Sequence, residues 1–242
     1  MDPLLIVALI AAVVCAFCWI ASLITKDTSW VDRLWSIVPA VYVWVFAAGS
    51  GLADPRLVVM AVLVTLWGAR LTFNFARKGG YSGMEDYRWA ILRERMTPAQ
   101  FQVFNLLFIV LYQNALLVLI TLPALTALEN PRPFSALDIV LAALFLAALA
   151  GETVADQQQW DFHRWKAAEV AAGREPSSRF LQTGLWRFSR HPNFFFEQLQ
   201  WWLLFLMGAV AAGTVLVWTV VGAALLTVLF VGSTIFTESI TR

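Results

Sequence analysis

Seven long apolar runs, nearly free of charge, constrain the fold of this chain more than any other feature of its sequence. Each run is long enough to cross ~30 Å of hydrocarbon as a helix. Backbone polar groups in lipid must be satisfied within the segment, and the runs lack the alternating pattern of a membrane β-barrel. We therefore predict an all-α integral membrane protein whose seven transmembrane helices form one domain, residues 1–242. The predicted spans are about 3–24, 34–51, 56–75, 99–123, 134–155, 193–212 and 214–236.

The composition agrees with this class of protein and excludes others. Only 14% of the residues are charged, against roughly a quarter in soluble domains. The net charge of +1 gives no electrostatic reason to expect nucleic acid as a partner. Cys15 and Cys18 lie inside the first run, where we expect them to pack as small apolar residues, and we expect no metal site.

Lysine and arginine are distributed unequally between alternate loops. The first, third and fifth loops and the C-terminus together hold fourteen of them, whereas the second, fourth and sixth loops hold two. Cytoplasmic loops of membrane proteins are enriched in these residues. We therefore predict that the N-terminus lies outside and the C-terminus in the cytoplasm.

Polar residues gather in three stretches that this orientation places on the cytoplasmic side: 27–35, 79–96 and 151–197. Three stretches on one side of the membrane indicate one pocket there. Asp138 is the acid in the outer half, and its place near a span end is typical of an interfacial residue. A polar path across the membrane is not indicated.

Two carboxylates lie near the hydrocarbon in the third stretch. Glu152 and Asp156 are four residues apart and therefore share a helix face. Carboxylates within a membrane are costly and usually have a partner or a ligand, which favours a functional role. We expect this helix to continue past the membrane through Arg164, because no helix breaker precedes Gly173.

The start of the sixth span resembles an anion site. Pro192 suits the first turn of a helix, where its missing N–H costs nothing, and Ser189 or His191 could cap that turn. A helix N-terminus presents unpaired N–H groups and partial positive charge. Arg187 and Arg190 add full charges beside it, so the site suits a phosphate or carboxylate.

An amide and a carboxylate follow one turn apart on the same face of this helix. Asn193 and Glu197 lie deeper than an interfacial role would need, and could hold hydroxyl, amide or ribose groups of a ligand. Basic residues meeting lipid headgroups would explain the arginines but not this pair. The pair therefore favours a ligand site.

The run GLWRFSRHPNFFFE at 184–197 resembles the C-terminal signature of the steroid 5α-reductase family, and is closest to its poorly characterised bacterial branch. DTSWVDRLWS at 27–36, the region around Arg70, GGYSGMEDYRW at 79–89 and residues 152–162 also resemble that branch, so the similarity covers most of the chain. The family usually has tyrosine and glycine where this chain has Phe194 and Phe196.

The resemblance implies an enzyme that uses NADPH to reduce a carbon–carbon double bond conjugated to a ketone in a lipophilic, steroid- or isoprenoid-like substrate. Residues 1–123 would form the substrate side and 134–242 the cofactor side, in a bacterial inner (cytoplasmic) membrane. The cofactor residues that the resemblance implies are Asp156, His163, Arg164, Arg190, His191, Asn193 and Glu197. The reasoning from the residues themselves adds Glu152, Arg187 and Ser189 to this set.

The group that activates the ketone oxygen has several candidates. The steroid enzymes use a Gln-Glu pair in an early helix, which this chain lacks, and its third span has no tyrosine. Asp32 could serve only if burial kept it protonated, whereas Tyr87 needs no such shift. Glu85 and Asp86 are candidates by location alone.

Two other functions remain open. Membrane methyltransferases that use S-adenosylmethionine share a similar R-H-P-x-Y…E run; Glu197 would then hold the methionine group, and Glu238 would gain a role. A non-enzymatic lipid-binding or transport protein is the third class.

Overall fold

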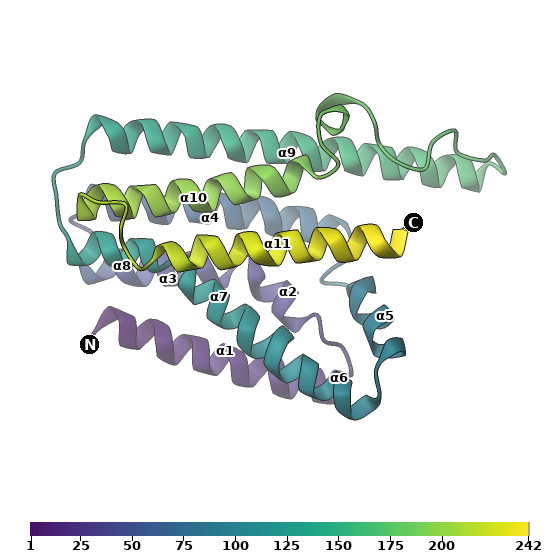
Figure 1. Cartoon of the computed structure of the whole chain (residues 1–242), viewed down its shortest axis with the longest axis horizontal. Helices are drawn as coiled ribbons and strands as arrows, with labels where there is room; N and C mark the ends of the chain where they lie inside the picture. Colours follow the sequence, from purple (N-terminus) through teal and green to yellow (C-terminus); the bar gives the residue numbers. More distant parts are fainter. Residues whose placement is uncertain (242) are drawn as a thin grey trace.

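The computed structural model describes residues 1–241, and every regular element in that range is helical (Figure 1). Seven helical segments are long and apolar enough to cross a membrane. The predicted all-α architecture and the number of candidate spans are thereby confirmed. The segments are Pro3–Thr25, Trp30–Gly49, Pro55–Arg77, Pro98–Glu129, Ala136–Ala171, Pro192–Ala212 and Val220–Ser239.

Several of these segments are composed of more than one helix. The chain order is α1 (Pro3–Thr25), α2 (Trp30–Trp35), α3 (Val38–Gly49), α4 (Pro55–Arg77), α5 (Tyr87–Arg95), α6 (Pro98–Phe104), the π-helical segment η1 (Asn105–Tyr112), α7 (Gln113–Leu119), α8 (Leu122–Glu129), α9 (Ala136–Ala171), the 3₁₀ turn η2 (Gly184–Arg187), α10 (Pro192–Ala212) and α11 (Val220–Thr241).

Prolines account for two breaks that the predicted spans did not include. Pro39 is the second residue of α3, and Pro123 is the second residue of α8. Proline lacks an N–H and its ring clashes with the preceding turn, so a helix cannot continue through it unbroken. The segments that correspond to the predicted spans 34–51 and 99–123, Trp30–Gly49 and Pro98–Glu129, are therefore each divided into shorter helices, with a break before the proline.

The fifth and seventh predicted spans, 134–155 and 214–236, also differ at their ends. α9 continues well past residue 155 to Ala171, as the absence of a breaker predicts, and projects beyond the other helices (Figure 1). α11 begins at Val220, and not at residue 214, because Gly213 ends α10 in the left-handed conformation, with φ of 73°.

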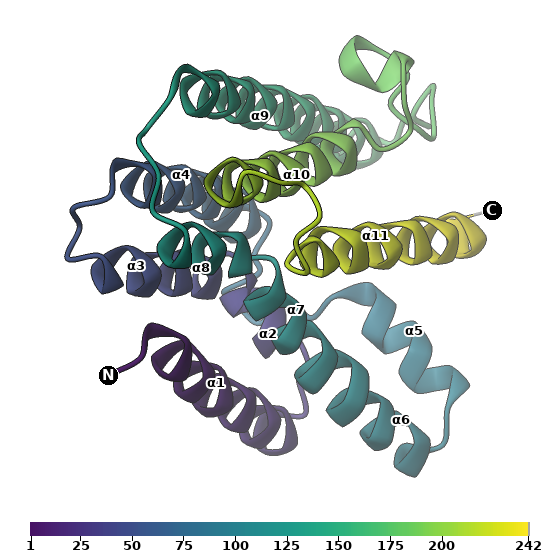
Figure 2. The ribbon, with the colours of Figure 1, turned by 60° about the vertical axis from the view of Figure 1, so that its left-hand side comes forward.

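α10 is central to the packing. It lies against α9, α8 and α11, and Figure 2 shows it between α9 and α11. The Trp67 ring of α4 meets the Trp201 ring of α10 edge to face, with 4.8 Å between centroids. Gly208 allows close approach to α8, since a Cβ there would lie 2.7 Å from the Pro123 carbonyl oxygen. Small residues serve helix packing in this way when lipid provides no hydrophobic driving force.

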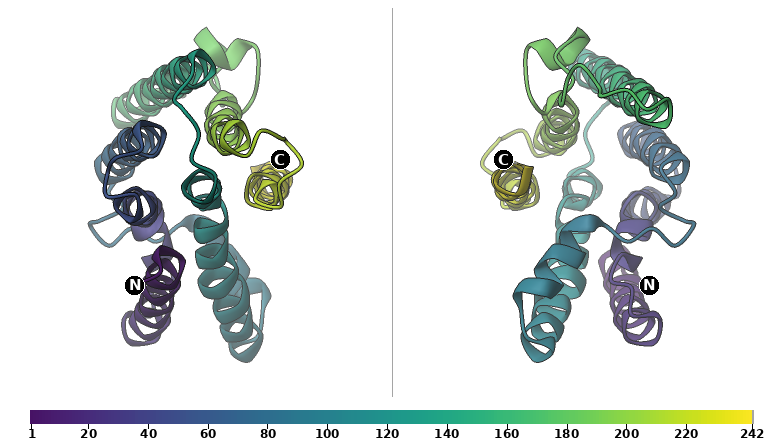
Figure 3. Two further views of the ribbon diagram at one scale, coloured as in Figure 1. Left: turned by 90° about the vertical axis from the view of Figure 1, so that its left-hand side faces the viewer. Right: turned by 90° about the vertical axis from the view of Figure 1, so that its right-hand side faces the viewer.

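α1 and the run from α6 to α7 form a separate side of the molecule. Viewed end on, they lie below the group of α3, α4, α8, α9 and α10 (Figure 3). α1 contacts α3, η1 and α7. The three polar stretches all lie toward the end of the bundle at which α11 ends (Figure 1).

Asp138 is not the interfacial residue that its position predicts. Its carboxylate is fully buried and pairs with the equally buried Arg56 of α4, at Nε–Oδ1 2.7 Å and Nη2–Oδ2 2.9 Å. The Ser135 backbone N–H and hydroxyl also donate to Asp138 Oδ2. This ion pair fastens α4 to α9 at the end of the bundle opposite the polar stretches.

Candidate functional site

Three carboxylates from two helices converge on one guanidinium inside the bundle. Arg70 of α4 contacts Asp156 of α9 at Nη1–Oδ2 2.5 Å and Glu152 of α9 at Nη2–Oε1 2.7 Å. Glu197 of α10 places its Oε2 3.9 Å from Arg70 Nη2. All four side chains are 10% exposed or less. We call these four residues the Arg70 cluster.

Two amide side chains donate hydrogen bonds to carboxylates of the Arg70 cluster, while Arg70 Nε and Gln200 Oε1 are buried without a hydrogen-bond partner among the described residues. The Gln200 amide donates to Glu152 Oε2 at 2.7 Å, and the Asn74 amide donates to Asp156 Oδ2 at 2.9 Å. Arg77 stands at the edge of the cluster, where its guanidinium donates to the Asn74 side-chain oxygen and to the Asp156 carbonyl.

Arg70 is the one cation of this site in direct ion-pair contact with the carboxylates among the described residues, and three carboxylates face it. Arg77 and Lys78 add positive charge near Asp156, at the edge of the cluster. Leaving buried charge uncompensated is strongly unfavourable. The arrangement therefore favours binding a further positive group or a proton beside the carboxylates.

The start of α10 leaves a polar atom without a partner. Pro192 is the first residue of the helix, as predicted; His191 occupies the N-cap position, but its side chain does not cap the turn. Ser189 Oγ accepts from the His191 backbone N–H at 3.1 Å. The Asn193 amide donates to Asp156 Oδ1 at 3.4 Å, while Asn193 Oδ1 is buried with no hydrogen-bond donor among the described residues.

The turn η2 brings a basic segment beside α9. Gly184 adopts φ of 60°, a conformation that favours glycine, and lies against the Gln158 side chain. The Trp186 indole N–H then donates to the Ala155 carbonyl at 3.0 Å, which holds the turn next to the Asp156 backbone. Arg187 follows directly and is exposed.

The remaining basic candidates are also exposed. Arg190 lies 3.3 Å from Glu238 of α11. His163 and Arg164 lie seven and eight residues beyond Asp156 on α9, roughly 10–12 Å along the helix. The structure thus divides the predicted cofactor residues into two sets. One is an inner set of three buried carboxylates and one half-buried amide (Glu152, Asp156, Glu197 and Asn193), and the other lies nearer the surface (His163, Arg164, Arg187, Ser189, Arg190, His191).

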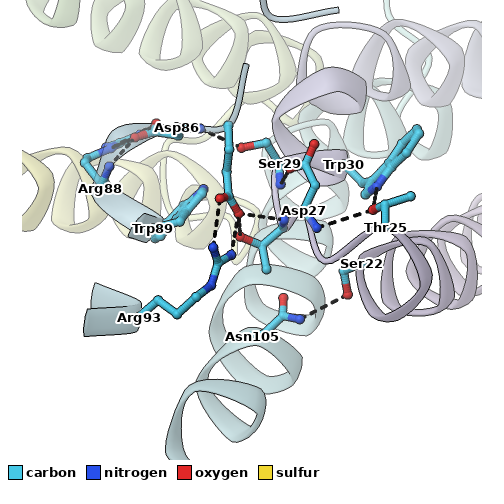
Figure 4. Close-up of polar contacts among 12 residues, drawn as sticks. Ser22, Thr25, Asp27, Ser29, Trp30, Asp86, Arg88, Trp89, Arg93 and Asn105 are labelled. Atoms are coloured by element: carbon cyan, nitrogen blue, oxygen red, sulfur yellow. Dashed lines mark hydrogen bonds and ion pairs between the residues drawn. The ribbon is translucent and has the colours of Figure 1, made fainter. Parts of the chain in front are cut away.

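A second polar cluster joins the loop before α2 to the loop before α5 (Figure 4). Glu85 accepts from the Thr28 backbone N–H and hydroxyl at 2.9 and 2.8 Å, and from the Arg93 guanidinium at 2.6 and 3.0 Å. Burial alone would raise the pKa of the Glu85 carboxyl, but the hydrogen bonds from Arg93 and Thr28 outweigh it and lower that pKa below its usual value. We call Thr28, Glu85 and Arg93 the Glu85 cluster.

Asp86 is similarly occupied by neighbours. It is the N-cap of α5, accepts from the Arg88 backbone N–H at 2.9 Å and pairs with the Arg88 guanidinium at 2.6 Å. Its own backbone N–H donates to the Ser29 hydroxyl at 3.0 Å. Glu85 and Asp86 thus organise the loop.

The other two candidates for activating a ketone, Asp32 and Tyr87, make fewer hydrogen bonds and ion pairs than Glu85 and Asp86 do. Asp32 of α2 is partly buried and accepts from the Trp89 indole N–H at 3.1 Å. Tyr87 begins α5, and its side chain is 53% exposed. α11 contacts both the loop before α5 and the start of α10. Arg88 of α5 donates to its Ser233 hydroxyl at 2.7 Å, and Arg190, just before α10, forms an ion pair with its Glu238.

Both phenylalanines that depart from the family motif are packed. Phe194 stacks on His191, with centroids 5.3 Å apart, and meets Phe230 of α11 edge to face at 4.7 Å. Phe196 lies against Gly151 of α9, where a Cβ would come within 2.6 Å of its ring. The glycine that permits close contact between α9 and α10 is therefore on α9 in this chain.

Sequence reasoning missed four polar residues of this site: Arg70, Asn74, Arg77 and Gln200. The region around Arg70 carries part of the family resemblance, but that resemblance gives Arg70 no role in the site. A signal was available, because Arg70, Asn74 and Arg77 follow the i, i+4, i+7 spacing of one helix face. A lone intramembrane arginine is itself a reason to look for carboxylate partners.

Comparisons with known proteins identify the family of this chain. An uncharacterized protein of Schizosaccharomyces pombe is 38% identical over 257 residues, which cover 98% of this chain and 74% of the relative. No solved structure matches the chain. A family model described as "Protein of unknown function (DUF1295)" matches residues 18–242, and the chain therefore belongs to the DUF1295 family.

Proposed function

We propose that this protein is a membrane-embedded, NADPH-dependent reductase of a carbon–carbon double bond conjugated to a ketone in a lipophilic, steroid- or isoprenoid-like substrate. The observation that carries the proposal is the buried Asn193 Oδ1, which lacks a donor beside the Arg70 cluster. Buried polar atoms in native proteins are nearly always hydrogen-bonded, so an unpaired one indicates a missing partner. A carboxamide such as that of nicotinamide offers the N–H that Asn193 lacks.

The charges around Asn193 also fit this cofactor. NADPH, when bound, supplies a hydride, and its nicotinamide ring becomes positively charged as it does so. The carboxylates of Glu152, Asp156 and Glu197 would stabilise that positive charge in a site of low polarity. The exposed Arg187 and Arg190 would hold phosphate groups at the start of α10.

The substrate's ketone needs a proton or hydrogen-bond donor as negative charge develops on its oxygen. Asp32 and Tyr87 are the two candidates whose side chains are less committed to the loop before α5. Asp32 must carry a proton to act as a donor, whereas the Tyr87 hydroxyl donates at neutral pH. Loss of turnover in Asp32→Asn or in Tyr87→Phe, with NADPH binding retained, would distinguish the two roles.

A second candidate is an S-adenosylmethionine-dependent methyltransferase. Glu238 lies 3.3 Å from Arg190 and 3.5 Å from His191, as an acid paired with the start of α10 would in such an enzyme. The buried carboxylates suit a sulfonium as well as they suit an oxidised nicotinamide. S-adenosylmethionine has no phosphate for the exposed arginines, and this favours the dinucleotide.

The test is a thermal-shift titration of detergent-purified protein with NADPH, NADH and S-adenosylmethionine in parallel. A ligand that binds only the folded state raises the apparent melting temperature. We expect stabilisation by NADPH, less by NADH, and none by S-adenosylmethionine. Stabilisation by S-adenosylmethionine alone would replace the reductase with the methyltransferase, and no response to any of the three would favour a non-enzymatic lipid-binding or transport protein.

Matched asparagine variants locate the site. Asn193→Ala should abolish the NADPH response, because it removes the unpaired amide. Asn130→Ala should retain the response. Asn130 donates to the Thr126 carbonyl at the C-terminal end of α8, which is the end of the bundle opposite the polar stretches. Equal responses in both variants would contradict the placement of the cofactor beside Asn193.

A further inference from the structure

A pocket of about 350 Å³ lies apart from the Arg70 cluster, where the end of α1 faces the α5–α6 connection. Its walls include Ser22, Lys26, Arg93, Phe101 and Gln102. The first candidate span ends at Thr25 and the fourth begins at Pro98, so the pocket lies at the level where both helices would leave the membrane. Its size is in the range of small-molecule sites.

The charged groups that line this pocket are both cations. Lys26 and Arg93 contribute to its wall, and no carboxylate does. Arg93 is held in place from two sides, by Glu85 at 2.6 Å and by the Phe101 ring, whose centroid lies 4.9 Å from the guanidinium carbon. Figure 4 shows the Arg93 guanidinium with two dashed contacts, which are its hydrogen bonds to Glu85. The arginine is thus fixed before any ligand arrives.

Lys26 differs from Arg93 in having no partner. Its ammonium makes no hydrogen bond or ion pair with any residue in the described part of the chain, and its backbone adopts φ of 57° at the C-cap of α1. Glycine and asparagine adopt that conformation more readily than lysine does. A lysine at this position is not explained by the turn, but its charge adds to the wall of the pocket.

The surroundings of the pocket are those of a lipid. Leu23 lines it and is 46% exposed, and the neighbouring Ile24 and Val103 are 76% and 58% exposed. Apolar side chains on this face therefore continue from the pocket along the outer surface of α1 and α6. A ligand with an anionic head and an apolar tail matches both parts.

We propose that this pocket binds the phosphate headgroup of an anionic membrane phospholipid, with Lys26 and Arg93 facing the phosphate and the acyl chains lying along α1 and α6. Basic pockets between membrane helices bind anionic headgroups by this combination of charge and apolar contact. The site is separate from the proposed reductase site, and its occupancy is measured without turnover.

The test compares lipid binding to Lys26→Asn and Arg95→Gln in neutral detergent, by native mass spectrometry with phosphatidylglycerol as the probe. Lys26→Asn removes the unpaired charge and suits the left-handed turn, so without lipid it should melt at or above the wild-type temperature. We expect it to bind phosphatidylglycerol about fivefold more weakly, as for the loss of about 1 kcal/mol per basic residue at a membrane surface. Arg95→Gln removes a charge from the same helix, α5, outside the pocket, and should bind like the wild type.

Two further probes separate the sources of the anion. Phosphatidylcholine should bind equally weakly to all three proteins, because its headgroup carries no net charge. Inorganic phosphate should not compete with phosphatidylglycerol, because it lacks the apolar tail. Unchanged binding in Lys26→Asn, equal weakening in Arg95→Gln, or full competition by inorganic phosphate would each overturn the proposal.

Discussion

Arg70 shows why one side chain can decide the stability of this site. Its guanidinium lies between the carboxylates of Asp156 and Glu152, with Glu197 slightly farther away. Replacing a whole buried ion network by apolar groups is often tolerated, whereas removing one partner is not. The arginine is the central cation for three buried acids. Removing it therefore leaves more uncompensated charge than removing any one of the acids.

Arg70→Met should therefore destabilise the protein by about 3–5 kcal/mol, the range found when one partner of a buried pair is removed. The measurement is thermal or denaturant unfolding in detergent without ligand. Adding Asp156→Asn to Arg70→Met should recover part of the loss, because it removes one of the stranded charges. If the double variant is less stable than the single variant, Asp156 is not stabilised through Arg70.

The residues of this site differ in how far the sequence predicts them. Glu152, Asp156, Asn193 and Glu197 can be selected from spacing and depth along single helices, and the structure places them together. Arg70 could not be joined to them in the same way, because α4 and α9 are distant in sequence and their pairing depends on tertiary packing. The spacing of residues along one helix identifies its polar face but not the helix that packs against that face.

At the scale of the helices, α9 and α10 are matched through one glycine and one aromatic ring. Phe196 occupies the position at which the resembling family usually has glycine, and Gly151 on α9 provides the space for its ring. The exchange of a small residue from one helix to its neighbour keeps the two backbones close. It also keeps Glu152, the next residue, facing Arg70.

Gly151→Ala should destabilise the α9–α10 contact by about 1–3 kcal/mol, the usual cost of overpacking a buried position. Gly232→Ala on α11 is the matched control, because a Cβ there meets nothing within 4 Å. That control should be neutral or stabilising, since alanine is the better helix former. Unfolding of the two variants in detergent gives the comparison, and adding Phe196→Ala to Gly151→Ala should relieve the clash.

Those features of the helices that depend only on local sequence can be predicted from it. Apolar length predicts the seven candidate spans, and the absence of a breaker predicts the extension of α9. The breaks before Pro39 and Pro123 could have been predicted from the prolines alone. The buried pairing of Asp138 with Arg56 could not, because position near a span end is equally compatible with an exposed interfacial carboxylate.

At the scale of the whole molecule, the polar groups are concentrated at one end of the helices. The Arg70 cluster, the Glu85 cluster and the exposed arginines lie on elements toward the end at which α11 finishes (Figure 1). α11 contacts Arg88 of α5 through Ser233 and Arg190 through Glu238. A water-soluble dinucleotide would have to approach from that end. The proposed function therefore depends on which side of the membrane this end faces.

The excess of lysine and arginine in the loops at this end predicts that it faces the cytoplasm. Two exposed glutamates at opposite ends of the bundle, Glu129 of α8 and Glu175 after α9, allow a matched test. In a background with Cys15 and Cys18 replaced by alanine, Glu129→Cys should react with a membrane-impermeant maleimide on intact bacterial cells. Glu175→Cys should react only after the membrane is permeabilised, and the cysteine-free background should not react in either condition. The opposite labelling pattern would place the arginines outside, away from cytoplasmic NADPH, and would contradict the predicted orientation and the reductase proposal together.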